Sequence, residues 1–148
     1  MKLASAFLTG AALFLLAAPA VAEDPPTVKV YRTPTCGCCG KWVSHLEANG
    51  FEVEVEEMDD VTPVKMANAV PGKLSSCHTA IVGGYVVEGH VPASDVVRLL
   101  EERPAVNGLA VPGMPIGSPG MEGPHPERYR VLTFDSEGKT EVFSTHGP

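Results

Sequence analysis

Hydrophobic and polar residues along the chain follow two periods, which together predict alternating strands and helices. Residues 51–56 alternate strictly between apolar residues and glutamate, which is typical of a strand with one buried and one acidic face. Residues 41–49 instead place Trp42, Val43 and Leu46 on one helical face, and a glycine follows as a common helix stop. The same criteria predict strands at 28–31, 79–82 and 85–90, helices at 62–70 and 92–103, and a hairpin of 129–134 with 140–143.

The order of these elements predicts the topology of the sheet. A helix between the first two strands is a crossover that makes them parallel, and the two-residue turn Gly83-Gly84 makes the next pair antiparallel. We therefore expect an α/β fold with a thioredoxin-like mixed sheet flanked by helices. A C-terminal β-hairpin and a long Gly/Pro/Met loop complete the prediction. Residues 104–126 hold six prolines and five glycines, so no regular element is predicted there.

The first 22 residues have the pattern of a secretory signal peptide. Lys2 precedes an apolar run at 3–16, and residues 18–22 supply the small side chains of a cleavage site. The run is shorter than the roughly 20 residues that a membrane-spanning helix needs. We expect an exported, periplasmic protein with a signal peptide at 1–22 and a single thioredoxin-like metal-binding domain at 23–148, without a membrane segment after cleavage. The alternative is an uncleaved anchor.

The charge of the chain argues against nucleic acid as a partner. The formal net charge is −7, and removal of residues 1–22 would make it −8, because that segment holds one lysine and no acidic residue. No basic patch is visible in the sequence, and a basic surface is what nucleic-acid binding requires.

The four cysteines are the most informative residues. Three lie together in Cys36-Gly37-Cys38-Cys39, and Cys77 stands beside His78. In an exported protein these sulfurs should be bonded in disulfides, bound to metal or kept reduced by a partner. Four cysteines allow three pairings, and the sequence does not choose among them; one alternative is a static Cys38–Cys77 disulfide.

The spacing within the cluster points to thiol chemistry. Cys36 and Cys39 have the C-x-x-C spacing at a predicted helix start, where unpaired N–H groups and the helix dipole stabilise a thiolate. They are therefore candidate catalytic residues, with Cys36 attacking and Cys39 resolving. Cys38 adds a sulfur that one disulfide cannot use, and Cys77, before the third strand, is expected to join the other three. Packed thiolates suit a soft metal species such as Cu(I), Zn(II) or an iron–sulfur group.

Three further residues are candidate metal ligands. His78 can offer a ring nitrogen, and Met114 and Met121 lie in the Gly/Pro-rich loop, with thioethers that bind Cu(I). The alternative for His78 is a plain surface or hydrogen-bonded histidine, and the alternative for Met114 and Met121 is that they pin the loop to an apolar surface. The remaining histidines are scattered along the sequence and are not assigned to the site: His45, His90, His125 and His146.

At these residues the chain resembles the exported copper-resistance proteins of the CopG type. The resemblance covers about residues 27–145 and is carried by the motifs at 35–42 (TCGCCGKW), 76–80 (SCHTA) and 111–122 (VPGMPIGSPGME). It implies a thioredoxin fold that binds Cu(I) through clustered thiolates and takes part in copper redox interconversion. The implied metal ligands are Cys36, Cys38, Cys39 and Cys77, holding Cu(I) as a multinuclear cluster.

The implied partners are copper ions, together with other periplasmic copper-resistance proteins or a thiol reductant. Two alternative functions remain open. One is a metal-free thiol–disulfide oxidoreductase acting on proteins, although residues 75–79 lack the proline that helps to shape a peptide groove in such enzymes. The other is a passive copper carrier or store without turnover.

Overall fold

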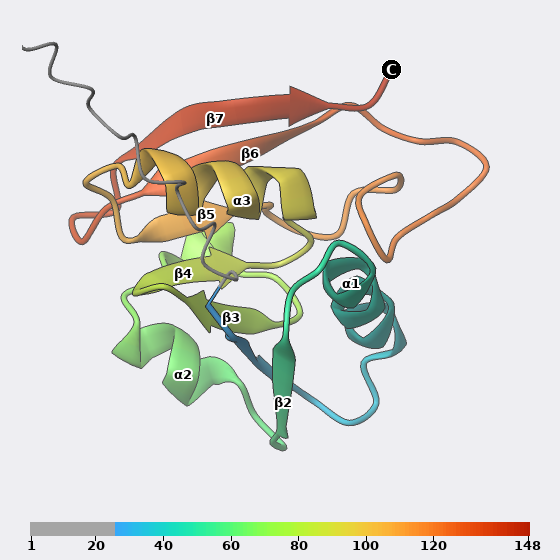
Figure 1. The fold of residues 1–148 in the computed structure, drawn as a ribbon, viewed down its shortest axis with the longest axis horizontal. Helices are drawn as coiled ribbons and strands as arrows, with labels where there is room; N and C mark the ends of the chain where they lie inside the picture. The colour runs from blue at the N-terminus through green and yellow to red at the C-terminus, as the bar shows by residue number, and fades with distance from the viewer. Residues whose placement is uncertain (1–25) are drawn as a thin grey trace, which may run out of the picture.

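A computed structural model describes residues 26–148, which form a seven-stranded mixed sheet with three helices (Figure 1). The predicted signal peptide, residues 1–22, lies outside the described residues. The strands are β1 (Val28–Arg32), β2 (Val53–Glu57), β3 (Thr79–Val82), β4 (Tyr85–Glu88), β5 (Gly108–Ala110), β6 (Tyr129–Phe134) and β7 (Thr140–His146). The helices are α1 (Gly37–Ala48), α2 (Thr62–Ala67) and α3 (Ala93–Glu102), and a short 3-10 turn, η1, spans Gly72–Leu74.

The strand order is β2-β1-β3-β4-β5-β6-β7. β1 pairs with β2 in parallel and with β3 antiparallel, and the Gly83-Gly84 turn joins β3 to an antiparallel β4. β5 is parallel to β4, and β6 and β7 extend the sheet as an antiparallel hairpin. The predicted mixed sheet, its flanking helices and the C-terminal hairpin are therefore confirmed.

One strand lies in the segment for which no regular element was predicted. β5 has only three residues, yet it joins β4 to β6 and so connects the two halves of the sheet. Its first residue must be glycine, because a Cβ on Gly108 would lie 1.9 Å from the carbonyl oxygen of Val86. The strand was not predicted because it is defined by its pairing with β4 and β6, while its own composition is typical of a loop.

The strand predicted to have one buried face is buried only at its beginning. Phe51, just before β2, is 4% exposed, whereas Val55 within β2 is 43% exposed. Among residues 26–148, β2 is an edge strand and has a neighbouring strand on one side only. The ion pairs Lys29–Glu56 and Arg32–Glu57 link it to β1.

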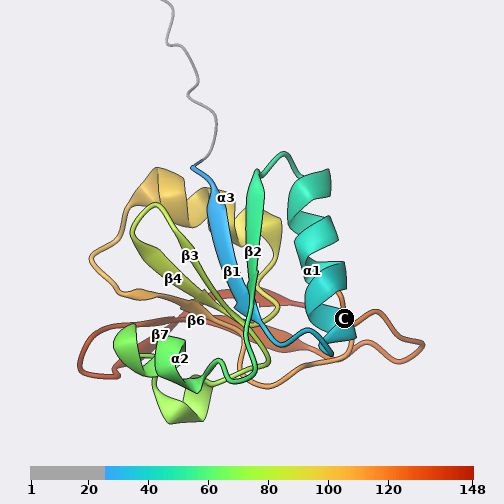
Figure 2. The same ribbon diagram turned by 90° about the horizontal axis from the view of Figure 1, so that it is seen from below.

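Helices cover both faces of the sheet. α1 and α3 pack on one face, where Trp42, Leu46 and Leu99 belong to the same apolar cluster. α2 lies on the opposite side (Figure 2), and the chain that follows it packs Leu74 against Phe134 in a second cluster. Within residues 26–148, no helix is both long enough and apolar enough to cross a bilayer.

Candidate metal centre

The cysteine cluster forms the first turn of α1, which begins at Gly37 rather than at the predicted residue 41. Cys36 is the N-cap residue, and Cys39 shares the buried face of the helix with Trp42. The first N–H groups of a helix have no partner within it, so this turn favours negative charge on the nearby sulfurs. The Arg32 guanidinium adds positive charge, since its Nη1 donates to the Cys36 carbonyl oxygen at 3.1 Å.

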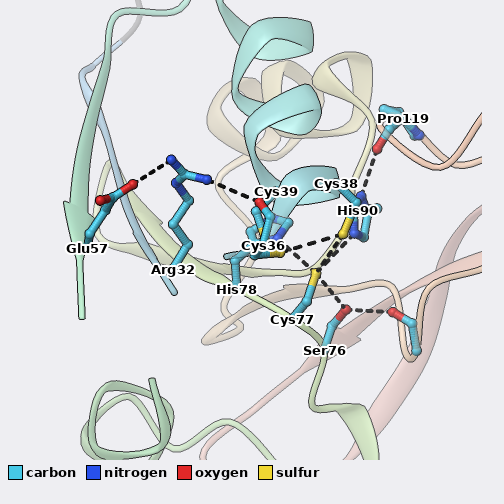
Figure 3. The surroundings of a disulfide bond; sticks show 11 residues. Arg32, Cys36, Cys38, Cys39, Glu57, Ser76, Cys77, His78, His90 and Pro119 are labelled. Carbon is cyan, nitrogen blue, oxygen red and sulfur yellow. Dashed lines mark hydrogen bonds and ion pairs between the residues drawn. A yellow bond between two sulfur atoms is a disulfide. The ribbon is translucent and has the colours of Figure 1, made fainter. Parts of the chain in front are cut away.

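The four sulfurs converge, as the sequence predicted (Figure 3). Cys36 and Cys39 form a disulfide, while Cys38 and Cys77 form none within residues 26–148, which include every cysteine of the chain. Cys38 Sγ lies 3.6 Å from Cys36 Sγ and 4.0 Å from Cys77 Sγ, and all four sulfurs lie within 4.8 Å of one another. The alternative of a static Cys38–Cys77 disulfide is not what the structure contains.

His90 also lies at this site, although the sequence analysis left it unassigned. Its Nε2 is 3.1 Å from Cys77 Sγ. The register of the β3–β4 hairpin indicates this contact. Thr79 pairs with Glu88, and two residues further along each strand Cys77 lies opposite His90. The Gly83-Gly84 turn fixes that register and could have revealed the pair.

The protonation of the Cys77–His90 pair follows from its hydrogen bonds. His90 Nδ1 lies 2.8 Å from the Pro119 carbonyl oxygen, which can only accept, so Nδ1 carries the proton. Burial lowers the pKa of His90 and so favours the neutral ring, in which Nε2 has a lone pair that faces the Cys77 sulfur. Burial and the neighbouring Cys38 raise the pKa of the Cys77 thiol to about 11. The Cys77 S–H therefore donates to His90 Nε2, and both atoms become metal donors once the thiol proton is lost.

His78 is a third donor beside Cys77. It is fully buried against the ring of Trp42, with ring centroids 4.3 Å apart, and its Nδ1 lies 3.3 Å from Cys77 Sγ. Burial, followed by the charges of His90 and Lys65, holds its pKa well below the ordinary value. Among the described residues its buried Nε2 has no hydrogen-bond partner. Cys77, His78 and His90 together form a second group of three donors within 4.8 Å.

The segment that carries Cys77 is held by a buried carboxylate. Glu88 is fully buried and accepts hydrogen bonds from the Ser76 N–H at 2.6 Å and from Thr79 Oγ1 at 2.7 Å. Lys65 from α2 forms an ion pair with the same carboxylate. The carboxylate therefore holds the Ser76 backbone immediately before Cys77, while Thr79 and Lys65 hold the carboxylate in place.

The Gly/Pro/Met loop packs against the start of α1. A Cβ on Gly120 would lie 2.7 Å from the Cys38 carbonyl oxygen and 2.9 Å from the Trp42 nitrogen, so the loop approaches the helix backbone closely. Met121 lines a cavity of about 540 Å³ together with Cys38, and Met114 is 50% exposed on the same loop. Coordination of a metal by either thioether remains a prediction.

The arrangement can exist in two chemical states. With the Cys36–Cys39 bond intact, the site consists of one disulfide beside two thiols, those of Cys38 and Cys77. With that bond reduced, four sulfurs and two imidazole rings converge, which is a donor set for a soft metal ion.

Comparison with known proteins supports one family. Residues 74–121 match a family described as "Protein of unknown function, DUF411", and no curated protein matches the chain. Two solved structures, named "Copper resistance protein copG" in Form 1 and Form 2, are each 44% identical to the chain, with a TM-score of 0.78. They cover 84% and 83% of this chain, which in turn covers 99% of each of them. With this identity over nearly the whole length of those structures, the chain belongs to the CopG family of copper-resistance proteins.

Proposed function

We propose that this protein is an exported copper-handling protein that binds Cu(I) through the thiolates of Cys36, Cys38, Cys39 and Cys77. The observation that carries the proposal is the convergence of these four sulfurs within 4.8 Å in a member of the CopG family. Thiolates are soft ligands that select Cu(I), and a thiolate can bridge two ions. Three sulfurs on one helical turn favour such bridging and hence a multinuclear copper cluster.

The disulfide makes the site redox-active in this proposal. Cys36 and Cys39 must be reduced before all four sulfurs can bind. Two Cu(II) ions that take one electron each from the two thiolates would become two Cu(I) ions and leave one disulfide. A thiol reductant that reduces that disulfide would complete a cycle of Cu(II)-to-Cu(I) conversion.

Neighbouring residues would complete the copper site. His90 and His78 offer ring nitrogens beside Cys77, and the hydrogen bond from His90 Nδ1 to Pro119 fixes the orientation of that ring. Met121 lines one cavity with Cys38, which supports it as a thioether ligand in this proposal.

Anaerobic titration of the fully reduced protein with Cu(I), in competition with a chromophoric Cu(I) chelator, tests the proposal. The matched control is the double variant Cys38→Ser/Cys77→Ser, which keeps the C-x-x-C pair at the start of α1. We expect the wild type to bind more copper per chain and to withdraw it from a chelator that the variant cannot outcompete. Equal stoichiometry and affinity in the two proteins would exclude a four-sulfur site.

The Cys36–Cys39 disulfide at a helix start also favours a second candidate, a metal-free thiol–disulfide oxidoreductase acting on proteins. An insulin-reduction assay on the copper-free protein separates the two. Turnover comparable with that of thioredoxin, unaffected by a copper chelator, would support this second function.

A passive carrier or store would use the same ligands without turnover. Repeated additions of Cu(II) to the reduced protein, with a thiol reductant present, distinguish a carrier from an oxidoreductase. Cu(I) formation that continues beyond one round per site supports redox cycling, whereas arrest after one round indicates a carrier.

A further inference from the structure

We propose that the protein carries out an internal thiol–disulfide exchange, in which its disulfide moves from Cys36–Cys39 to Cys38–Cys77. The inference concerns the oxidised, copper-free protein. It rests on the proposed function only in using the same four sulfurs.

Cys38 is the residue that connects the two pairs. Its sulfur lies 3.6 Å from Cys36 Sγ, which is half of the disulfide, and 4.0 Å from Cys77 Sγ, the other free thiol. Both separations are close to van der Waals contact, so Cys38 can reach either neighbour with a small side-chain movement. Exchange needs only a thiolate next to a disulfide sulfur, with no other reagent.

The exchange takes two balanced steps. In the first, the Cys38 thiolate attacks Cys36 Sγ; a Cys36–Cys38 bond forms, the Cys36–Cys39 bond breaks, and Cys39 leaves as a thiolate. In the second, Cys77 gives its proton to His90 Nε2, which lies 3.1 Å away, and its sulfur attacks Cys38 Sγ; the Cys38–Cys77 bond forms, and Cys36 leaves as a thiolate. One disulfide and two thiols are present before and after, so no electrons are gained or lost. The protons released by Cys38 and Cys77 are taken up by Cys39 and Cys36.

The exchange changes which disulfide sulfurs an external thiol can reach, because the four cysteines are buried to different extents. Cys39 is fully buried, so an external thiol can approach the original disulfide only at Cys36. Cys38 lines the open cavity of about 540 Å³ with Lys41 and Met121, and Cys77 is only partly buried. Moving the disulfide to Cys38–Cys77 therefore places one disulfide sulfur, that of Cys38, at the cavity. Cys36 and Cys39 are then left as thiols.

The test follows the two disulfide isomers directly in the copper-free protein. Chains with one disulfide are acidified to stop exchange, the isomers are separated by reversed-phase chromatography, and their bonds are mapped by peptide mass spectrometry after alkylation. The purified Cys36–Cys39 isomer is then returned to neutral pH without oxidant. We expect the Cys38–Cys77 isomer to appear with first-order kinetics and with a rate constant that is independent of protein concentration.

Two variants serve as controls. Cys38→Ser, which removes the shared nucleophile, should keep the Cys36–Cys39 bond and leave Cys77 open to alkylation throughout. Cys36→Ser/Cys39→Ser should form the Cys38–Cys77 bond when oxidised, which shows that this bond is geometrically possible. A wild-type isomer that stays unchanged for hours, an apparent first-order rate constant that rises with protein concentration, or failure of the double variant to form the bond would each overturn the proposal. Copper binding is measured separately on fully reduced protein, so either proposal can fail without the other.

Discussion

The sulfur site has two sides that are built by different kinds of interaction. On the helix side, Cys36, Cys38 and Cys39 are held by one turn of α1, so their proximity is local in sequence. On the hairpin side, Cys77 and His90 are brought together by the register of β3 and β4, and by supports that are distant in sequence. We therefore expect the three sulfurs of the helix side to stay together after most changes elsewhere in the protein. The position of Cys77 on the hairpin side depends on a few buried polar contacts.

The largest expected effect comes from Glu88→Ala, which removes the carboxylate behind Cys77. We expect the free energy of unfolding to fall by about 4 kcal/mol, because loss of one partner leaves the Lys65 charge and the Ser76 N–H without compensation. Urea unfolding followed by the fluorescence of Trp42, the single tryptophan, measures the change. Alkylation of Cys77 should also become faster, while the Cys36–Cys39 bond stays intact.

The control for that change is Glu102→Ala. Glu102 pairs with Arg98 on the surface of α3, where solvent screens the pair, so the expected loss is much smaller than that of Glu88→Ala. If both variants lost the same stability, the buried network would not be what holds the Cys77 segment.

A smaller effect is expected from Gly120→Ala, which tests the contact between the loop and α1. Gly120 has φ +86°, and the new methyl group would meet the backbone of Cys38 and Trp42, so the loop must move away from the helix at a cost of about 2 kcal/mol. NMR of the His90 ring should report the loss of its Pro119 partner.

Gly113→Ala is the matched control within the same loop. Gly113 also has a positive φ, of +70°, but nothing lies within 4 Å of a Cβ there. Gly113→Ala should therefore lower the free energy of unfolding only by the backbone strain of about 1 kcal/mol, and the NMR signals of the His90 ring should not change. Identical losses in the two variants would mean that the loop does not support the site.

The smallest effect is a pH dependence of stability that originates on the hairpin side. Because the pKa of His78 in the folded protein is well below its ordinary 6.5, its contribution to stability is present above pH 6.5 and is lost as the pH falls. Between pH 6.5 and 5.5 the unfolded chain binds the proton first, and the loss is about 1 kcal/mol. Urea unfolding of the copper-free protein at both pH values measures it.

His78→Asn should reduce this dependence and leave the part that comes from His90 and His45, whose pKa values burial also lowers, whereas substitution of the exposed His125 should leave it unchanged. A slope unchanged in His78→Asn would show that the loss of stability arises elsewhere.

The same division explains what the sequence could predict. The C-x-C-C cluster at a helix start and the Gly83-Gly84 turn are local signals, and they predicted the sulfur trio and most of the sheet. His90 was missed because its role comes from a strand register and a carbonyl group of the distant residue Pro119. β5 was missed for a similar reason, since a three-residue strand is specified by the strands on either side of it.

The acidic edge strand β2 has a consequence for how copies of the protein meet. No other strand in the described part of the chain pairs with its outer side, and an open strand with an exposed valine such as Val55 is a template for pairing with another chain. Glu54 and Glu56 flank that valine, and Glu56 is paired with Lys29, so a second copy approaching in the same orientation would meet the carboxylate of Glu54 next to the valine. Charge on an open edge strand opposes pairing with a second chain, and the glutamates of β2 place such charge at this end of the sheet.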